Sequence, residues 1–457
     1  MPRHRYLVGV VLLSLLAAAC QPSASASPEE SGAAPTGSYL ERAEAGEFDG
    51  TTVQILAQWI DAEGENFEAN LTAFAERTGI DIQYEGVTDY ESYLIRQVDA
   101  DQAPDIAQIA QPGRMREFQS EDKLVNLSEF IDTATFAENF PSFVDLVTVD
   151  DGIYGIPYKA DLKSIVWYPN AAFEEAGYEI PTTWEELIAL TDEIRGTGVT
   201  PWCISMEHGD ATGWVATDWI EDILLRTASP ETYDQWVSHE IPFNDPAVLH
   251  AADLMAEIWF TEGNVYGGST AINNTFVGDT QNPMFAEGGP DCFFHKQASW
   301  IYTFWPGYVA ATETEPAVIE NEPGVDSSFF YFPPIDEEFG SPVLGAGDMF
   351  MMFNDRDEVR AVIEFLSTPE AAEQWIATGS FVSPNLAVPA EWYSVYPASG
   401  LAEILRTATT LKFDASDLMP AAVGQRTFWD GMVEWVAADG ANTEEVFAEI
   451  EASWPEE

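Results

Sequence analysis

The sequence predicts an α/β protein with two lobes, and alternating strand-like and helix-like segments are the first evidence. Apolar runs at 51–59, 80–87 and 104–110 predict strands, and the amphipathic segments 65–79 and 91–101 between them predict helices. Strands that alternate with helices form a mostly parallel sheet with right-handed crossovers.

Chain length is the second observation. About 400 residues follow residue 51, which is more than a single hydrophobic core usually organises. The globular part is therefore expected to divide into two lobes.

Polar and aromatic residues follow two of the predicted strands. Trp59, Asp61 and Glu63 follow the first strand, and Gln108 and Gln111 lie at the end of the third. Because ligands of such sheets bind beyond the carboxyl ends of the strands, these five side chains are expected to face a cleft.

Residues 1–20 have the pattern of an export signal. Arg3 and Arg5 form a basic start, and Leu7 to Leu16 form an apolar core. The core is too short for a membrane-spanning helix, and no later stretch approaches the ~20 apolar residues that such a helix needs.

The end of this signal resembles a lipobox. Ala17 to Ala19 precede Cys20, which implies lipidation of that cysteine and an anchor on the outer face of the cell membrane. Plain secretion is the alternative, because alanine stands where leucine is commonest. Residues 21–48 are rich in Ser, Ala, Pro and Glu, and this composition predicts a flexible, disordered tether.

Charge excludes one class of partner. The chain has 78 Asp and Glu against 18 Lys and Arg, a formal net charge of -60. Binding to nucleic acid needs clustered Lys and Arg, so we expect no nucleic-acid partner. The acids are dispersed along the chain, which predicts a solvated acidic surface suited to a salty or alkaline habitat.

Two cysteines remain after Cys20. Cys203 and Cys292 are expected to form a disulfide in an exported, oxidising setting; two separate buried thiols are the alternative. Neither cysteine has the spacing of a zinc site and the five histidines are scattered, so we expect no metal and no cofactor.

The stretch 151–187 is unusually dense in turns and short elements. A turn at Asp151-Gly152 precedes strands at 154–158 and 164–169, and a helix runs from Asn170 to Gly177. A threonine with a glutamate three residues on then predicts the capped start of another helix. Such a stretch is expected where the chain crosses between lobes.

Four motifs here occur in order: Gly-Ile-Pro-Tyr at 155–158, Trp-Tyr-Pro-Asn at 167–170, Phe-Glu-Glu-Ala-Gly at 173–177 and Pro-Thr-Thr-Trp-Glu-Glu-Leu at 181–187. This order resembles the family 1 extracellular solute-binding proteins, the sugar receptors of ABC importers, and most closely their maltose and α-glucoside branch. The resemblance implies a type II periplasmic-binding-protein-like fold with discontinuous lobes joined by hinge segments. Residues 49–160 and about 340–385 would form the first lobe, and about 161–339 and 386–457 the second.

The resemblance also implies a sugar site. Sugar rings have one apolar face and a rim of hydroxyl groups, so a receptor uses aromatic rings and carboxylates. Trp59 and Glu63 match the family's loop after the first strand, Asp161 and Glu207 match sugar-binding acids, and Trp214 lies close behind Glu207. For any one tryptophan, such as Trp202, Trp219, Trp236 or Trp259, core packing is the alternative.

Two further tryptophans match positions where the family stacks a sugar ring: Trp300 and, near the carboxyl end, Trp429. Ile109 and Pro112 stand where maltose receptors tend to have an aromatic residue and an acid, so the first lobe's part of the site differs from theirs.

Residues 342–385 give a second match. Gly345 to Gly347 are expected to form a turn before a buried strand at 349–353, with Asp348 at the mouth of the cleft. The segment 412–420, Lys-Phe-Asp-Ala-Ser-Asp-Leu-Met-Pro, looks specific to the α-glucoside branch.

The expected function is a monomeric sugar receptor that closes on its ligand without chemistry and then docks on the permease subunits of an ABC importer. A secreted glycoside hydrolase and a surface adhesin are the alternatives. Paired carboxylates suit a hydrolase, but with so many acids a pair arises by chance, and no G-x-S-x-G, H-E-x-x-H or P-loop motif is present.

Overall fold

The computed structural model of the chain describes residues 37–306, 308–309 and 318–455. The predicted export signal, Cys20 and residues 21–36 of the predicted tether lie outside the described residues. The described α-helices are α1 Tyr39–Glu44, α2 Asp61–Thr78, α3 Tyr90–Asp99, α4 Pro112–Ser120, α5 Thr133–Asn139, α6 Val144–Val147, α7 Asn170–Ala176, α8 Trp184–Thr197, α9 Trp214–Thr227, α10 Pro230–Val237, α11 Pro246–Trp259, α12 Gly268–Asn274, α13 Asp357–Leu366, α14 Glu373–Ala377, α15 Ala398–Thr407, α16 Ala415–Leu418, α17 Trp429–Ala437 and α18 Thr443–Ala452. The described strands are β1 Thr52–Ala57, β2 Asp81–Gly86, β3 Ile106–Ile109, β4 Thr148–Val149, β5 Gly152–Ile153, β6 Ile156–Leu162, β7 Ile165–Pro169, β8 Thr200–Trp202, β9 Cys292–Lys296, β10 Tyr308–Val309, β11 Val318–Ile319, β12 Ser327–Tyr331, β13 Pro342–Met352 and β14 Thr410–Phe413.

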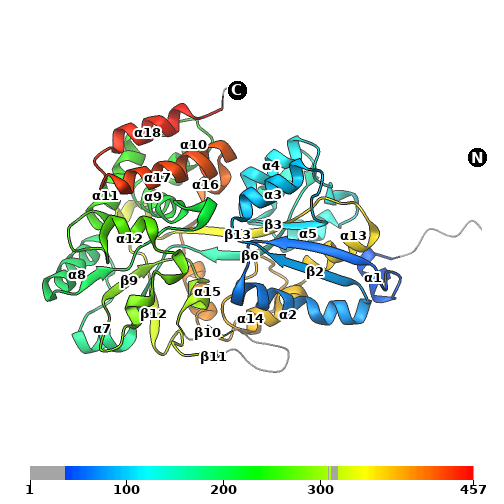
Figure 1. The fold of residues 1–457 in the computed structure, drawn as a ribbon, viewed down its shortest axis with the longest axis horizontal. Helices are drawn as coiled ribbons and strands as arrows, with labels where there is room; N and C mark the ends of the chain where they lie inside the picture. The colour runs from blue at the N-terminus through cyan, green and yellow to red at the C-terminus, as the bar shows by residue number, and fades with distance from the viewer. Residues whose placement is uncertain (1–36, 307, 310–317, 456–457) are drawn as a thin grey trace, which may run out of the picture. The chain divides into compact units, whose positions relative to one another are not determined.

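The first sheet has the strand order β14-β13-β3-β1-β2, and β6 also pairs with β13 (Figure 1). β1 is parallel to β2 and β3, with α2 and α3 as the connections, which confirms the predicted alternation of strands and helices. β13 runs antiparallel to both β3 and β6, so a strand from late in the chain completes a sheet begun near its start.

Helix α2 ends as predicted. The apolar face of this helix buries Phe67, Leu71 and Phe74, and Gly79 follows it with φ 71° and donates its N–H to the carbonyl of Ala75. Only glycine adopts that left-handed conformation without a steric cost, which is why the helix stops there.

The predicted turn at Gly345 to Gly347 is wrong, because both glycines lie in the middle of β13. A Cβ atom on Gly347 would lie 2.5 Å from the carbonyl oxygen of Lys159 on β6. Glycine here permits the close approach of two strand backbones. The same residue type that usually marks a turn therefore marks a tight strand pairing at this position.

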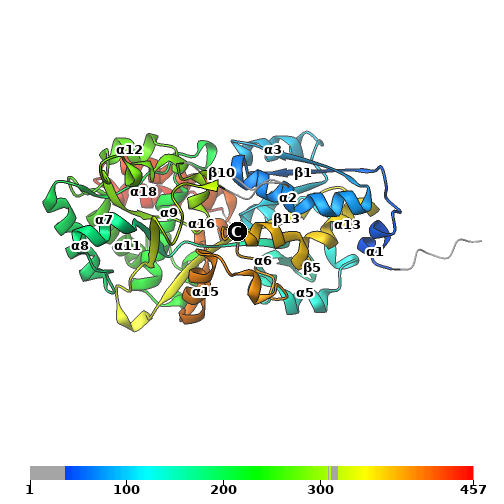
Figure 2. The same ribbon diagram turned by 90° about the horizontal axis from the view of Figure 1, so that it is seen from below.

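The prediction of a flexible segment as far as residue 48 is wrong for residues 38–48. Helix α1 begins with a capping box between Ser38 and Glu41 and packs on α13 (Figure 2). Leu40 donates its N–H to Glu364 of α13 at 2.7 Å, and Arg42 pairs with Asp357 at 2.7 Å. These contacts to a distant element offset the low hydrophobicity of the segment.

The second sheet has the order β12-β7-β9-β8. β12 and β9 are antiparallel to β7, and β8 is parallel to β9. Helix α8, which follows β7 and α7, begins as predicted: Thr183 accepts the N–H of Glu186 at 3.2 Å, and the Glu186 carboxylate accepts the N–H of Thr182 at 2.8 Å.

Each sheet packs against a large hydrophobic core, and each of these two cores draws on two separate stretches of sequence; a smaller third cluster includes Leu162, Trp167 and Leu401. One core takes its buried residues from 43–158 and 349–388, and the other from 166–344 and 415–450. Many tryptophans of the middle region are buried in the second core, which is the alternative of core packing given above. They are Trp202, Trp219, Trp236 and Trp259.

A disulfide joins Cys203 to Cys292, which confirms the predicted pair. The two Cα atoms are 5.6 Å apart, and the two cysteines are separated by 89 positions in the sequence. The disulfide lies beside the paired strands β8 and β9. It therefore fixes the start of the loop that carries Glu207.

Candidate ligand-binding site

A cavity of about 350 Å³ is lined by residues that follow β1, by β6 and β13, and by segments from 207–214, 276–304 and 414–429. Elements of both hydrophobic cores thus contribute to one hollow. Nine of the eleven residues predicted to bind ligand line it: Trp59, Glu63, Gln111, Asp161, Glu207, Trp214, Trp300, Asp348 and Trp429.

The other two predicted residues do not line the cavity. Asp61 starts α2 with φ 49°, and its side chain is exposed; its charge lies at the N-terminus of the helix, which a carboxylate stabilises. Gln108 is fully buried and donates from Nε2 to Oδ1 of Asp348 at 2.6 Å. Gln108 therefore holds a cavity residue in place without reaching the cavity.

Lys159 is the centre of a buried charge cluster on the cavity wall. Its Nζ lies 2.9 Å from Oε1 of Glu63, 3.3 Å from Oδ2 of Asp161 and 4.0 Å from Oδ2 of Asp348. Burial alone would lower the pKa of Lys159, but the three carboxylates outweigh it and raise the pKa above its ordinary value. Lys159 is therefore a fixed ammonium among three acids from α2, β6 and β13.

The surroundings of Asp348 shift the pKa of its carboxyl group strongly. Burial, followed by the repulsion of Asp161 and Glu63, raises the pKa of Asp348 from 3.8 to about 7, although Lys159 opposes the shift. Gln58 and Gln108 both donate to Oδ1 of Asp348, at 3.3 and 2.6 Å. The carboxyl group thus has a fixed orientation on the strand that passes through the first sheet.

A second lysine, Lys163, organises another part of the cavity wall. Nζ of Lys163 lies 2.7 Å from Oδ1 of Asp218 and also binds Asp414. Lys163 and other neighbours hold the pKa of Asp414 below its usual range in spite of burial, whereas burial raises the pKa of Asp218 and of Asp417. One ammonium therefore anchors acids from α9 and from the segment before α16.

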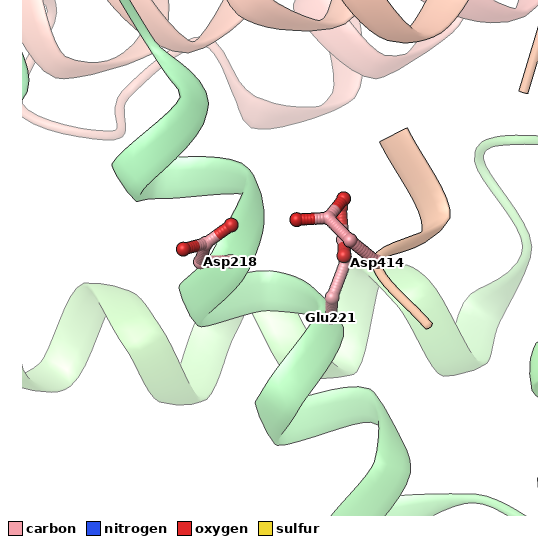
Figure 3. Close-up of side chains that lie close together, drawn as sticks. All are labelled: Asp218, Glu221 and Asp414. Carbon is pink, nitrogen blue, oxygen red and sulfur yellow. The ribbon is translucent and has the colours of Figure 1, made fainter. Parts of the chain in front are cut away.

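Three carboxylates of this wall, from Asp218, Glu221 and Asp414, have oxygen atoms within 4.8 Å of one another (Figure 3). The site does not require a metal, because Lys163 already binds two of the three. Glu221 is also occupied, since it accepts the N–H groups of Ala415 and Ser416 at 2.8 and 3.0 Å. The cluster is a lysine-neutralised support for the start of α16.

Five aromatic rings form a closed circuit on the cavity wall, in which each ring contacts the next. The centroid distances are 6.1 Å for Trp214 and Trp300, 5.6 Å for Trp300 and Phe304, 6.2 Å for Phe304 and Phe276, 5.9 Å for Phe276 and His208, and 6.4 Å for His208 and Trp214. All five side chains are partly exposed and line the cavity. They offer flat apolar surface to a ligand.

Trp59 and Trp429 are much more buried than these rings. Trp59 is 2% exposed, and its ring packs edge-on against Phe67, Phe350 and Trp375, so most of it belongs to the core. Trp429 is 3% exposed, and its indole N–H has no hydrogen-bond partner among the described residues. This N–H is a donor available to a ligand oxygen.

Sequence reasoning missed several cavity residues. Lys159 and Asp161 alternate along β6, and Lys163 continues this period of two directly after the strand ends, which is a signal that the three share a face. Only Asp161 was predicted. Phe276, Phe304 and His208 had no such signal, because they come from loops and a short 3-10 helix without a regular pattern.

A two-lobed α/β fold with one cavity rich in carboxylates and aromatic rings defines a ligand receptor. The family description "Bacterial extracellular solute-binding protein" matches residues 59–373, and the chain belongs to this family. The family consists of binding proteins, which confirms the expectation of a receptor rather than an enzyme. No helix among the described residues is long and apolar enough to cross a membrane.

Two relatives resemble the chain along most of its length. It is 42% identical over 411 residues to the osmoprotective compounds-binding protein GgtB of Synechocystis sp., covering 90% of this chain and 94% of that one. It is 39% identical over 422 residues to the alpha-glucosides-binding periplasmic protein AglE of Rhizobium meliloti, covering 89% and 88%.

Solved structures share the fold at low sequence identity. The bacterial solute receptor AcbH has a TM-score of 0.72 at 17% identity, with 88% of this chain and 97% of that one covered. Maltose-bound MalE3 of T. maritima has a TM-score of 0.67 at 15% identity, with 88% and 98% covered. These matches confirm the predicted fold class.

Proposed function

We propose that the protein is the extracytoplasmic sugar-binding component of an ABC importer and that its ligand is an α-glucoside or another oligosaccharide. One observation carries the proposal: the cavity combines five partly exposed aromatic rings with carboxylates held by two lysines. The rings suit the apolar faces of sugar units, and the carboxylates accept their hydroxyl protons. The α-glucoside-binding relative supports the same ligand class.

Binding proceeds in this proposal by closure of two lobes. The first lobe comprises residues 49–160 and about 340–385, and the second comprises about 161–339 and 386–457, with hinge segments where the chain crosses between them. Each core draws on two separate stretches of sequence, which supports this division. The ligand stabilises the closed form by binding it more tightly than the open one.

The proposal assigns a role to each predicted residue except Asp61. Hydrogen bonds from sugar hydroxyl groups are accepted by Glu63, Asp161, Glu207 and Asp348. Sugar rings stack on Trp214 and Trp300. Gln111 offers an amide, Gln108 positions Asp348, and Trp429 donates its indole N–H. Trp59 supports the wall, and Asp61 takes no direct part.

The proposal also includes a membrane anchor: Cys20 is lipidated and holds the protein on the outer face of the cell membrane. The closed, monomeric receptor then docks on the permease subunits, and an ATPase on the cytoplasmic side drives release of the sugar.

The test is a calorimetric screen of maltose, trehalose, sucrose, palatinose and maltodextrins. Binding of at least one sugar, with no glucose released on incubation, supports a receptor, whereas release of glucose indicates a hydrolase. Binding of none of them contradicts the proposal.

A tryptophan variant tests the site. Trp300→Ala should weaken binding at least tenfold and reduce the change in tryptophan fluorescence when sugar is added. Trp392→Ala is a matched control, because Trp392 is also partly exposed but does not line the cavity. Unchanged affinity in Trp300→Ala would remove the assignment of the site.

A further inference from the structure

The cavity wall carries many more acids than bases. Two lysines, Lys159 and Lys163, line it. The acids of the lining are Glu63, Asp89, Glu91, Asp161, Glu207, Asp348, Asp414 and Asp417. No arginine and no third lysine is among the described lining residues.

Both lysines are already engaged by the protein. Lys159 has Glu63 and Asp161 within 3.3 Å, and its Nζ lies 5.7 Å from the ring centre of Trp300. Lys163 binds Asp218 and Asp414, and its Nζ lies 5.1 Å from the ring centre of Trp214. An anionic ligand group would have to compete with these carboxylates for each ammonium.

The excess of negative charge persists when protonation is considered. Burial is the largest cause of a raised pKa at Glu63, Glu91, Asp348 and Asp417. If all four of these groups were neutral, four carboxylates of the lining would still face two ammonium groups.

The N-terminus of α16 offers an anion no free donors either. The first N–H groups of α16 are taken by the protein's own acids, because Glu221 accepts from Ala415 and Ser416, and Asp414 accepts from Asp417 at 3.2 Å. The start of α16 is therefore occupied by the protein's own acids.

We propose that the cavity selects its sugar by charge: it accepts neutral glycosides and glycosides with an amino group, and it rejects those with a carboxylate or a phosphate. The proposal rests on the proposed function as a sugar receptor. The physical cause is that an anionic group would lie against a wall with an excess of carboxylates. The two ammonium groups of that wall are already paired with acids of the protein.

The experiment compares three ligands of nearly equal size. It uses whichever of maltose, trehalose and sucrose binds most tightly, together with its derivatives in which every primary hydroxymethyl group is a carboxylate or an aminomethyl group. Changing every primary position prevents the ligand from turning its charge out of the cavity. At neutral pH, calorimetry should show the carboxylate derivative binding at least 100-fold more weakly than the parent and the amino derivative within tenfold of it.

A charge-neutralising variant separates electrostatics from shape. Glu207→Gln should shift the ratio of carboxylate to parent affinity at least threefold toward the carboxylate. Glu240→Gln is the matched control, because Glu240 is exposed and does not line the cavity, and its ratio should be unchanged.

Two results would overturn charge selection alone: a carboxylate derivative that binds within tenfold of the parent, or an unchanged ratio in Glu207→Gln. Failure of all three parent disaccharides and of every other sugar in the screen would overturn the proposed function, and charge selection with it. The two failures are thus distinguishable.

Discussion

Lys159 and Asp161 stand two residues apart on β6, and Nζ of Lys159 lies 3.3 Å from Oδ2 of Asp161 on the cavity wall. Residues at this spacing share a strand face, so the strand itself presents a base and an acid to the same hollow. Glu63 from α2 joins the pair at 2.9 Å. The wall is therefore preorganised by the protein before any ligand binds.

Removing this lysine should destabilise the fold. Lys159→Met leaves three buried carboxylates without their common counterion, and loss of one partner of a buried ion pair costs about 3–5 kcal/mol. Urea denaturation at pH 7 should show that loss, and the loss should shrink toward pH 4, because burial raises the pKa of Glu63 and of Asp348 and these two groups take up protons. Lys412→Met is the control, since Lys412 pairs with an exposed Asp234 and such pairs contribute about 0–1 kcal/mol. Equal effects of the two substitutions would contradict the role of Lys159.

The raised pKa of Asp348 predicts a pH dependence of stability. The folded form keeps the proton up to a pKa of about 7, whereas the unfolded form loses it near 3.8. Between these values the folded state binds more protons, so stability falls as pH rises, by up to about 4 kcal/mol from this group. Asp348→Asn keeps an oxygen acceptor for Gln108 and should remove this part of the decline. A wild-type and variant difference that does not change between pH 4 and 7 would refute the assignment.

Two glycines with different surroundings give a matched pair of substitutions. Gly347→Ala would place a Cβ atom 2.5 Å from the carbonyl oxygen of Lys159, and such overpacking costs about 1–3 kcal/mol. Gly196→Ala lies in α8 with nothing within 4 Å and should stabilise the protein by up to about 1 kcal/mol. Thermal unfolding of both variants measures the difference. A neutral Gly347→Ala would show that β6 and β13 can separate without cost.

The acidic composition predicts stabilisation by salt. A formal charge of -60 repels itself across the surface, and the screening length falls to ~3 Å at 1 M salt. Among the residues that the structure describes, six of the seven non-glycine residues with positive φ are aspartates, so acids also occupy turn positions that asparagine or glycine commonly fill. The melting temperature should rise from low to molar salt at pH 7 and rise less at pH 4. No rise at pH 7 would contradict adaptation to a salty habitat.

Local pattern predicted the parallel strands β1, β2 and β3 and the ends of α2 and α7 well, because hydrophobic periodicity and terminal glycines act within a few residues. Trp59, Glu63 and Gln111 followed from their positions after strands, and Trp300 from a family motif. The glycines of β13 were wrongly predicted to form a turn. Glycine is equally typical of a turn and of two strand backbones in close contact, and only the position of the partner strand β6 distinguishes the two. The five-ring circuit was beyond sequence reasoning, because Phe276 and His208 meet through tertiary packing alone.

The packing of α1 on α13 shortens the segment between the proposed lipid anchor and the folded part of the receptor. If Cys20 carries the lipid, only the residues from Cys20 to Ser38 separate the anchor from the folded unit. A chain of that length reaches at most about 60 Å. In the proposed lipid-anchored form, the folded unit would therefore stay close to the membrane surface, which keeps its local concentration at the permease high.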